Sequence, residues 1–374
     1  MNRRVLDFLA CPKCGGDLTF RDANENGHSL NQKLECRECS ADFPIVNSIP
    51  RFVTSENYAT NFGFQWNAFR ATQLDSHSGV PISRSRFIEQ TGWTKEDLRG
   101  KLVLDIGCGA GRFAEIALDL GAEVVAVDYS SAVDACLANL GSNERLTVMQ
   151  ADVYRLPFKP ESFDFVYCFG VLQHTPNVEA AFKSIPRVLK AGGGLAVDVY
   201  PKLWRTLFEA HYWVRPLTKR VDGPRLFRLV QRAVPLLLPV SRALGRIPLL
   251  GRWLRHAVPV SNYEGRYPLD ERQLREWAIL DTFDMLAPAH DNPQTRATVK
   301  AWFQQAGLIR IEVFRLGQWV GRGKKNLPSD AQWFQDNVSL QESRHAEDAA
   351  QETRTARTLR WFTPEPSTGG DSRR

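Results

Sequence analysis

The sequence, 374 residues long, predicts an α/β fold around a mostly parallel sheet. Two observations lead to this prediction, and a third concerns the membrane. Short apolar stretches alternate with helical patterns between residues 100 and 200. The first stretch, 103–106, runs into a glycine-rich turn and then into a helix. No window of 18 apolar residues exists, so we expect no transmembrane segment.

The turn after the first predicted strand holds Gly107, Gly109 and Gly111. Glycine permits a tight turn and a close approach between backbone and ligand, because no Cβ is in the way. The N–H groups at the start of the following helix, 113–120, favour a carboxylate or phosphate. The turn alone is weak evidence, because dinucleotide-binding proteins use a similar one. Its last two glycines are two residues apart rather than three, which argues against a nicotinamide dinucleotide fold.

Four further strands follow, and acidic, aromatic or glycine residues stand at the ends of the first three. Asp128 ends the second strand, a position that suits an acid accepting hydrogen bonds from ribose hydroxyls. Asp152 follows the third strand, and Phe169 and Gly170 follow the fourth. The predicted strands cover 123–128, 146–151, 163–168 and 195–200, with a helix over 178–189 and a glycine turn at 192–194 before the last.

In this order the motifs resemble those of the class I S-adenosylmethionine-dependent methyltransferases, closely over about 100–200 and more loosely over 269–325. The resemblance implies a Rossmann-like sheet of seven strands, the last antiparallel, and S-adenosylmethionine as the cofactor. It implies that Asp128 binds the ribose diol, that Asp152 and the Val153 backbone bind the adenine amino edge, and that Phe169 and Gly170 border the sulfonium. The cofactor set that it implies is completed by Asp105, Gly107, Cys108, Gly109, Gly111 and Tyr129.

Simpler roles are the alternatives for the three acids. Asp105 would merely fix the glycine turn, Asp128 would be a solvated strand-end acid, and Asp152 would be a turn residue.

Four of the seven cysteines form the pattern C-x₂-C…C-x₂-C, with 21 residues between the pairs Cys11, Cys14 and Cys36, Cys39. Two such pairs complete tetrahedral coordination of Zn²⁺, and a segment of about 50 residues has too small a core to be stable without a crosslink. Disulfides would need an oxidising compartment, whereas the N-terminus has no apolar signal region and predicts a cytoplasmic protein. We therefore expect a closed, structural zinc site, with iron or redox chemistry as the less favoured alternative. The segment 1–53 resembles the small zinc-ribbon activator subunits found beside some methyltransferases.

Residues 54–100 are expected to form a lid or linker before the core. Aromatic residues crowd 61–69, where Gln65 and Trp66 would contact the cofactor if the segment folds over it. A helix packed outside the sheet is the alternative. Residues 83–86, which include two arginines, would belong to the same lid.

The methyltransferase domain is expected to cover 101–326, interrupted by a basic helical insertion at 201–268. Between 201 and 262, twelve Lys or Arg face two acids, so the local net charge is +10 while the whole chain has +6. The prolines at 216, 224, 235, 239, 248 and 259 predict that this region is divided into short helices.

Three interpretations of the insertion stay open. Short basic amphipathic helices over 203–262 would suit an anionic membrane or a lipid-linked acceptor, which would place a cytoplasmic protein peripherally at the inner membrane surface. The same charge would suit the phosphates of a nucleic acid, although the Leu, Val and Pro runs make this partner the least expected. A substrate cap whose arginines are merely solvated is the third.

After the insertion we expect a helix over 269–283, a loop over 284–295, a helix to residue 306 and a closing pair of strands at 308–316 and 318–321. From residue 327 the chain is polar, and we expect a disordered tail.

Methyl transfer from a sulfonium is one in-line displacement, so alignment and exclusion of water are its main requirements. His174, just past the fourth strand, lies where the family places groups that face the methyl, and an imidazole suits a base. Asp284 and His290, with Asp281 and Asp291, lie in the loop expected to contact the substrate. A shape-defining role for His174 and helix capping for the acids are the alternatives.

We therefore expect an S-adenosylmethionine-dependent methyltransferase that acts on a small acceptor or on a lipid- or saccharide-linked one. A ribosomal or transfer RNA base methyltransferase and a non-catalytic scaffold that binds S-adenosylmethionine are the alternatives. The presence of Asp105, Asp128 and Asp152 together argues against the scaffold.

Overall fold

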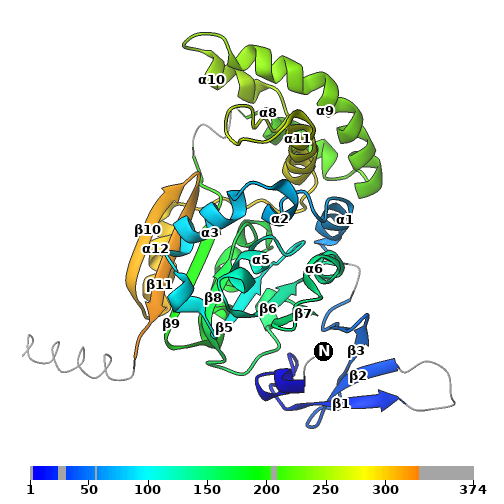
Figure 1. Cartoon of the computed structure of the whole chain (residues 1–374), viewed down its shortest axis with the longest axis vertical. Coiled ribbons are helices and arrows are strands. Elements are labelled where there is room, and N and C mark those ends of the chain that lie inside the picture. The colour runs from blue at the N-terminus through cyan, green and yellow to red at the C-terminus, as the bar shows by residue number, and fades with distance from the viewer. Residues whose placement is uncertain (1–2, 24–30, 55–56, 204–208, 328–374) are drawn as a thin grey trace, which may run out of the picture. The chain divides into compact units, whose positions relative to one another are not determined.

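The computed structural model describes residues 3–23, 31–54, 57–203 and 209–327, and the chain up to Lys325 forms one compact unit. Figure 1 shows its elements along the chain. The predicted tail, 327–374, lies outside the described residues except for Leu327, and so do residues 204–208 of the predicted insertion. Among the described residues, no helix has the length and apolar character needed to cross a membrane.

A seven-stranded mixed sheet forms the centre, in the order β10-β11-β9-β8-β5-β6-β7 (Figure 1). The five strands from β5 to β9 pair in parallel, and β11 runs antiparallel to both of its neighbours. This confirms the predicted class I sheet with its antiparallel closing strand. The strands are β5 (Leu102–Ile106), β6 (Glu123–Asp128), β7 (Leu146–Gln150), β8 (Phe163–Cys168), β9 (Leu189–Val199), β10 (Leu308–Leu316) and β11 (Gln318–Lys325).

Helices cover both faces of this sheet, which explains why its parallel strands are nearly continuous apolar runs. On one face, Phe87, Phe113 and Cys136 belong to the buried cluster of α3, α5 and α6. On the other, Phe182 and Trp302 bring α7 and α12 into a second buried cluster. The helices are α3 (Ile82–Thr91), α5 (Arg112–Asp119), α6 (Ala132–Leu140), α7 (Val178–Ser184) and α12 (Arg296–Gln305), the last capped by Thr295 as predicted.

The start of β9 differs from the prediction. The glycines expected to form a turn at 192–194 lie within β9, which begins at Leu189. The register against β8 shifts between Phe163 and Phe165, so the glycines accommodate an irregularity inside the strand rather than a separate turn.

The N-terminal ribbon has its own four-stranded sheet and is joined to the core at two places. At the first of these places, Leu9 forms a β-bridge with Phe158, and the Phe8 ring packs against Phe158 and Phe163. At the second, Arg51 forms a bridge with Gln150, at the end of β7. The strands are β1 (Leu18–Ala23), β2 (Asn31–Cys36), β3 (Asp42–Val46) and β4 (Ile49–Pro50), after a 3₁₀ helix, η1 (Arg3–Asp7).

Beyond the sheet, α9 and α11 share a buried cluster that includes Val234 and Phe283. Figure 1 shows α8 to α11 grouped together. The α-helices not yet given are α1 (Thr60–Ala68), α2 (Asp75–Ser78), α4 (Lys95–Leu98), α8 (Ala210–Thr218), α9 (Gly223–Gly245), α10 (Gly251–Leu254) and α11 (Glu271–Leu286).

Two expectations about these helices were wrong. The prolines do not divide the insertion as predicted, because α9 continues for 23 residues through Pro235 and Pro239. Both prolines are exposed, so water is available to the backbone carbonyls that lose their helical partner. The loop predicted to hold Asp281 and Asp284 is instead part of α11, which extends to Leu286.

Candidate active site

A cavity of about 960 Å³ opens at the carboxyl ends of β5, β6, β8 and β9. This is where ligands bind in open α/β sheets, because the loops leaving parallel strands diverge there. The wall is completed by α1, α3, α11 and the chain around α8, through Trp66, Arg86, Asp284 and Tyr212. The segment before the core therefore covers the cavity, as expected for a lid. The segment after β9 covers it as well, as expected if the insertion is a cap.

The glycine turn leaves no room for side chains. Gly107, Gly109 and Gly111 all have positive φ, at 77°, 52° and 92°. A Cβ on Gly107 would lie 2.1 Å from Val171 Cγ2, and one on Gly111 would lie 2.7 Å from Leu140 Cδ1. Glycine is therefore required for both conformation and space, and Gly107, Cys108 and Gly109 line the cavity with backbone.

Asp128 lies at the cavity wall, where β6 ends. Its Oδ2 accepts the Gly109 N–H at 3.0 Å, and its Oδ1 accepts the Ser130 N–H and hydroxyl at 2.8 and 2.7 Å. Burial raises the pKa of its carboxyl, while the Ser130 and Gly109 donors oppose the rise. Beside it, the rings of Tyr129 and Tyr58 lie 4.9 Å apart and also line the cavity.

The other two predicted acids point elsewhere. Asp105 does not line the cavity and is buried beside Tyr167, where burial raises its pKa to about 8. Asp152 accepts the Tyr154 N–H at 2.9 Å and caps the 3₁₀ turn η2 (Val153–Arg155), so its neighbour Val153, not Asp152 itself, is part of the lining.

Phe169 and Gly170 line the cavity just past β8, and Gly170 is held by a buried acid on the next strand. The Gly170 N–H donates to Asp198 Oδ1 at 2.5 Å. Asp198 Oδ2 accepts from Arg86 Nη2 at 2.6 Å and from Gln90 Nε2 at 2.8 Å. We did not identify Asp198 from the sequence, although a carboxylate within an apolar strand is a signal that could have found it.

His174 lines the cavity, and its Nδ1 lies 3.1 Å from the carbonyl of His290. A carbonyl only accepts, so Nδ1 carries the proton and Nε2 is the nitrogen free to accept one when the ring is neutral. The His290 ring is not part of the lining, and it packs against Tyr58. Of the two predicted histidines, the structure thus brings only the His174 side chain into the cavity.

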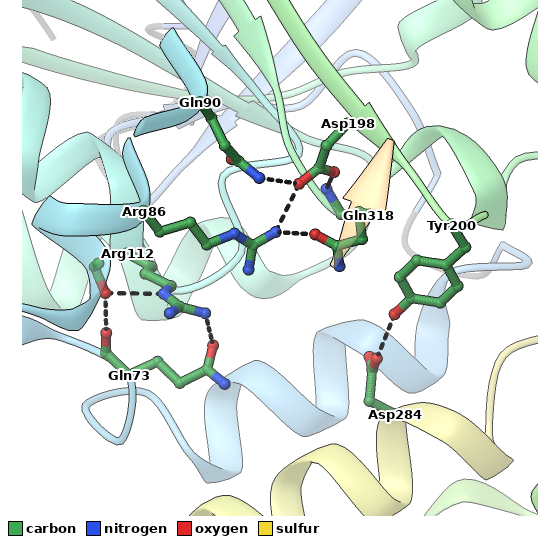
Figure 2. A network of polar contacts seen from close by, with 10 residues as sticks. Gln73, Arg86, Gln90, Arg112, Asp198, Tyr200, Asp284 and Gln318 are labelled. Atoms are coloured by element: carbon green, nitrogen blue, oxygen red, sulfur yellow. Dashed lines mark hydrogen bonds and ion pairs between the residues drawn. The ribbon is translucent and has the colours of Figure 1, made fainter. Parts of the chain in front are cut away.

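Asp284 faces the same cavity from α11 (Figure 2). Gln65 Nε2 donates to its Oδ1 at 3.3 Å, and the Tyr200 hydroxyl donates to its Oδ2 at 3.4 Å. Burial raises the pKa of Asp284, and His174 opposes the rise by charge. Tyr200 also packs edge-on against His174, so these groups form one polar cluster.

Arg86 and Arg112 contribute two guanidinium groups to the lining (Figure 2). Arg86 bonds to Asp198 and to Gln318 Oε1, the latter at 2.9 Å. Arg112 donates to the Ser83 hydroxyl at 2.9 Å and to Gln73 Oε1 at 2.7 Å. The predicted lid segment therefore does reach the cavity through Arg86, whereas Arg112 and Gln73 were not identified from the sequence.

The four ribbon cysteines Cys11, Cys14, Cys36 and Cys39 come together, with all four sulfurs within 4.8 Å of one another. The Sγ atoms of Cys11 and Cys39 are 3.7 Å apart, and those of Cys14 and Cys36 are 3.4 Å apart. A tetrahedral zinc ion with Zn–S bonds of about 2.3 Å needs sulfurs about 3.8 Å apart, so the cluster fits Zn²⁺. Within the described residues no other group of acids, histidines or cysteines of this kind is found.

The fold, the glycine turn and the cavity define a class I methyltransferase domain that follows a four-cysteine ribbon. Family comparison agrees: residues 104–197 match the methyltransferase domain family, and residues 2–48 match the Trm112p-like protein family. The chain thus carries a methyltransferase domain and, before it, a Trm112p-like domain.

Curated relatives match mainly through the core. A sterol 4-C-methyltransferase of Caenorhabditis elegans is 35% identical over 98 residues, which are 25% of this chain and 29% of that protein. A ubiquinone biosynthesis O-methyltransferase of Coxiella burnetii is 32% identical over 114 residues, or 30% of this chain and 47% of that protein. An uncharacterized chloroplastic methyltransferase of Arabidopsis thaliana is 32% identical over 220 residues, or 51% of this chain and 61% of that protein. The chain thus spans less than two thirds of the length of each.

A solved complex that contains the Haloferax volcanii Trm112 methyltransferase activator has a TM-score of 0.41 and 13% identity with this chain. The match covers 71% of this chain and 97% of that one.

Proposed function

We propose that this protein binds S-adenosylmethionine in the cavity and transfers its methyl group to a small acceptor or to a lipid- or saccharide-linked one. The observation that carries the proposal is the glycine turn, which presents backbone to the cavity at Gly107 and Gly109 beside the Asp128 carboxylate. The cofactor would supply an activated methyl on a sulfonium. The protein would supply alignment and exclusion of water.

In this proposal Asp128 holds the ribose hydroxyls, since its carboxylate ends β6 at the cavity wall. Tyr58 and Tyr129 flank the adenosine, and Val153 offers its backbone to the base. Phe169 and Gly170 border the sulfonium. Asp105 acts behind the glycine turn rather than on the ligand, because it is buried outside the lining.

The acceptor's proton would pass to His174 or Asp284. His174 has Nε2 available as an acceptor because the His290 carbonyl engages Nδ1. Asp284 is held by Gln65 and Tyr200 within the same cluster, and burial raises its pKa, which makes it a stronger base than an exposed carboxylate. His290 would act through its carbonyl, as a positioning residue.

Titration calorimetry with S-adenosylmethionine and S-adenosylhomocysteine tests the cofactor assignment. Two hydrogen bonds from hydroxyls to a carboxylate are worth about 1.5–3 kcal/mol each, so Asp128→Asn is expected to weaken both ligands by roughly tenfold or more. Glu123→Gln, at the opposite end of β6, is the matched control and should bind as wild type. Equal affinities for Asp128→Asn and wild type, or no binding by wild type, would contradict the proposal.

We also propose a peripheral contact between the insertion and an anionic membrane surface. Nine of the thirteen large apolar side chains that are exposed among the described residues lie between Trp213 and Trp253. Arg225, Arg228 and Arg232 are exposed on the same helix as Leu236 and Val240. A basic helix with exposed apolar side chains binds the boundary between headgroups and acyl chains, and here it would deliver a lipid-linked acceptor beside the cavity.

A further inference from the structure

Four arginines line the cavity, and they differ in their partners. Arg86 is paired with Asp198 at 2.6 Å and Arg215 with Asp291 at 2.7 Å. Arg112 and Arg266 make no ion pair with any residue that the structure describes: Arg112 bonds to a hydroxyl and an amide, and Arg266 lies over the rings of Tyr263 and Tyr267. Two cationic groups therefore face the cavity without a carboxylate of their own.

The surroundings of Arg112 oppose its positive charge. Burial and repulsion from Arg86 together lower its pKa to about 10, and the negative charge of Asp281 opposes this fall only in part. The ring of Phe113 has its centroid 5.1 Å from the guanidinium carbon of Arg112 and 5.3 Å from that of Arg86, so the two cations are held near one ring. Two guanidinium groups gathered in a partly buried site favour an anion between them.

Two acids of the cavity, Asp281 and Asp284, already have hydrogen-bond partners. Asp281 accepts from the Tyr263 hydroxyl and from Gln73 Nε2, the latter at 3.3 Å, and burial raises its pKa to about 6. Asp284 is held by Gln65 and Tyr200, as described above. The Nη2 group of Arg112 donates to none of the described residues, so the cavity lining contains hydrogen-bond donors that have no partner among them.

We propose that Arg112, with Arg86 beside it, binds a carboxylate or phosphate of the methyl acceptor, so that the acceptor is an acid. This inference rests on the proposed methyl transfer and names its class of substrate. The neighbouring rings favour an acceptor whose acidic group is attached to a flat or apolar part. The Trp277 ring centroid lies 5.4 Å from the guanidinium carbon of Arg112, and the ring centroids of Trp277 and Tyr267 are 5.4 Å apart.

The test uses the full-length protein saturated with S-adenosylhomocysteine and titrated with benzoate, with phenyl phosphate and with neutral benzamide. We expect wild type to bind one of the two anions and not benzamide. Arg112→Gln should weaken binding of that anion at least tenfold. Arg112→Lys keeps the positive charge but loses the planar pair of guanidinium donors, so it should weaken binding less. Arg225→Gln, on the exposed face of α9, is the control and should change nothing.

Three outcomes would overturn the inference: neither anion binds, benzamide binds equally well, or Arg112→Gln binds the anions like wild type. A fourth concerns the source of the anion. If Arg112→Gln weakens S-adenosylhomocysteine but not methylthioadenosine, which has no carboxylate, the site holds the carboxylate of the cofactor and the acceptor assignment is wrong. Failure of the proposed function is separate, since wild type would then bind no S-adenosylhomocysteine at all.

Discussion

Asp105 and Asp128 lie on neighbouring parallel strands, and their surroundings differ. Asp128 reaches the cavity, whereas Asp105 faces the packed helices α3 and α5 together with Val103 and Tyr167. Burial raises the pKa of Asp105 to about 8, so the native protein keeps this carboxyl neutral at pH 7. Between about pH 4 and pH 8 the unfolded chain loses a proton that the native protein retains.

This difference predicts that Asp105 reduces stability as the pH rises. Each pH unit within that interval costs about 1.4 kcal/mol for a group that is ionised only when unfolded. Asp105→Asn imitates the neutral acid, so its free energy of unfolding should approach or exceed that of wild type as the pH rises from 4 to 8. Urea denaturation at pH 4.5, 6 and 7.5 measures this. Parallel pH profiles for the two proteins would show that Asp105 is ionised in the native state.

Residues with local reasons for their position could be predicted from the sequence. Gly107, Gly109 and Asp128 belong to one strand–turn–helix unit followed by its next strand, and chain neighbours determine their geometry. Arg112 and Gln73 could not be found in this way, since 39 residues separate them and only tertiary packing brings them together. The direction of the Asp105 side chain also depends on which face of β5 the helices cover.

At the scale of elements, the strands could be predicted from local sequence, whereas the helices around the insertion depend on tertiary packing. Apolar runs between turn residues predict the bounds of β5, β6 and β8 to within about a residue. This works because these strands are buried on both faces, so each strand ends where its apolar run ends. The length of α9 could not be predicted, because whether a helix tolerates Pro235 and Pro239 depends on which of its faces is solvated. Pro288, which follows the C-cap Ala287, is a stop signal for α11 that could have been used; without it Asp284 was expected to lie in a loop.

The ribbon should depend on its metal. Cys36→Ser removes one of four ligands, so we expect zinc content to fall from about one ion per chain and protease cleavage within 3–53 to become faster. Cys136→Ala, at a cysteine of α6 outside the ribbon, should keep its zinc. Atomic absorption and limited proteolysis measure the two effects. A Cys36→Ser protein with full zinc content would show that the four sulfurs are not the ligands.

One ion pair joins the insertion to the chain after α11. Arg215 on α8 and Asp291 are both nearly buried, with side chains 10% and 6% exposed. Removing one charge of a buried pair leaves the other uncompensated, so Arg215→Met should destabilise the protein by about 3–5 kcal/mol. The double variant Arg215→Met with Asp291→Asn should recover much of this loss in chemical denaturation. Additive effects of the two single changes would mean that the pair is not coupled.

At the scale of the whole molecule, the exposed apolar residues of the insertion predict membrane binding. Leu236 and Leu249 are 74% and 98% exposed, so replacing both by Glu should leave folding unchanged and reduce sedimentation with anionic vesicles. Val46→Glu, at a 47% exposed position of the ribbon, is the matched control. Binding should weaken with salt and with neutral lipid. If wild type stays in the supernatant at low salt, the insertion serves only as a cap over the cavity.

The shared carboxylate of Asp198 has a consequence for how two ligands would influence each other. One of its oxygens holds the Gly170 N–H beside the proposed cofactor site, and the other holds Arg86 beside the proposed acceptor site. An anion that draws the Arg86 guanidinium away from Asp198 alters the acceptor of the Gly170 hydrogen bond. The two affinities are then thermodynamically linked, and the factor by which the anion changes cofactor binding must equal the factor by which the cofactor changes anion binding. Asp198→Asn should bring that factor closer to one.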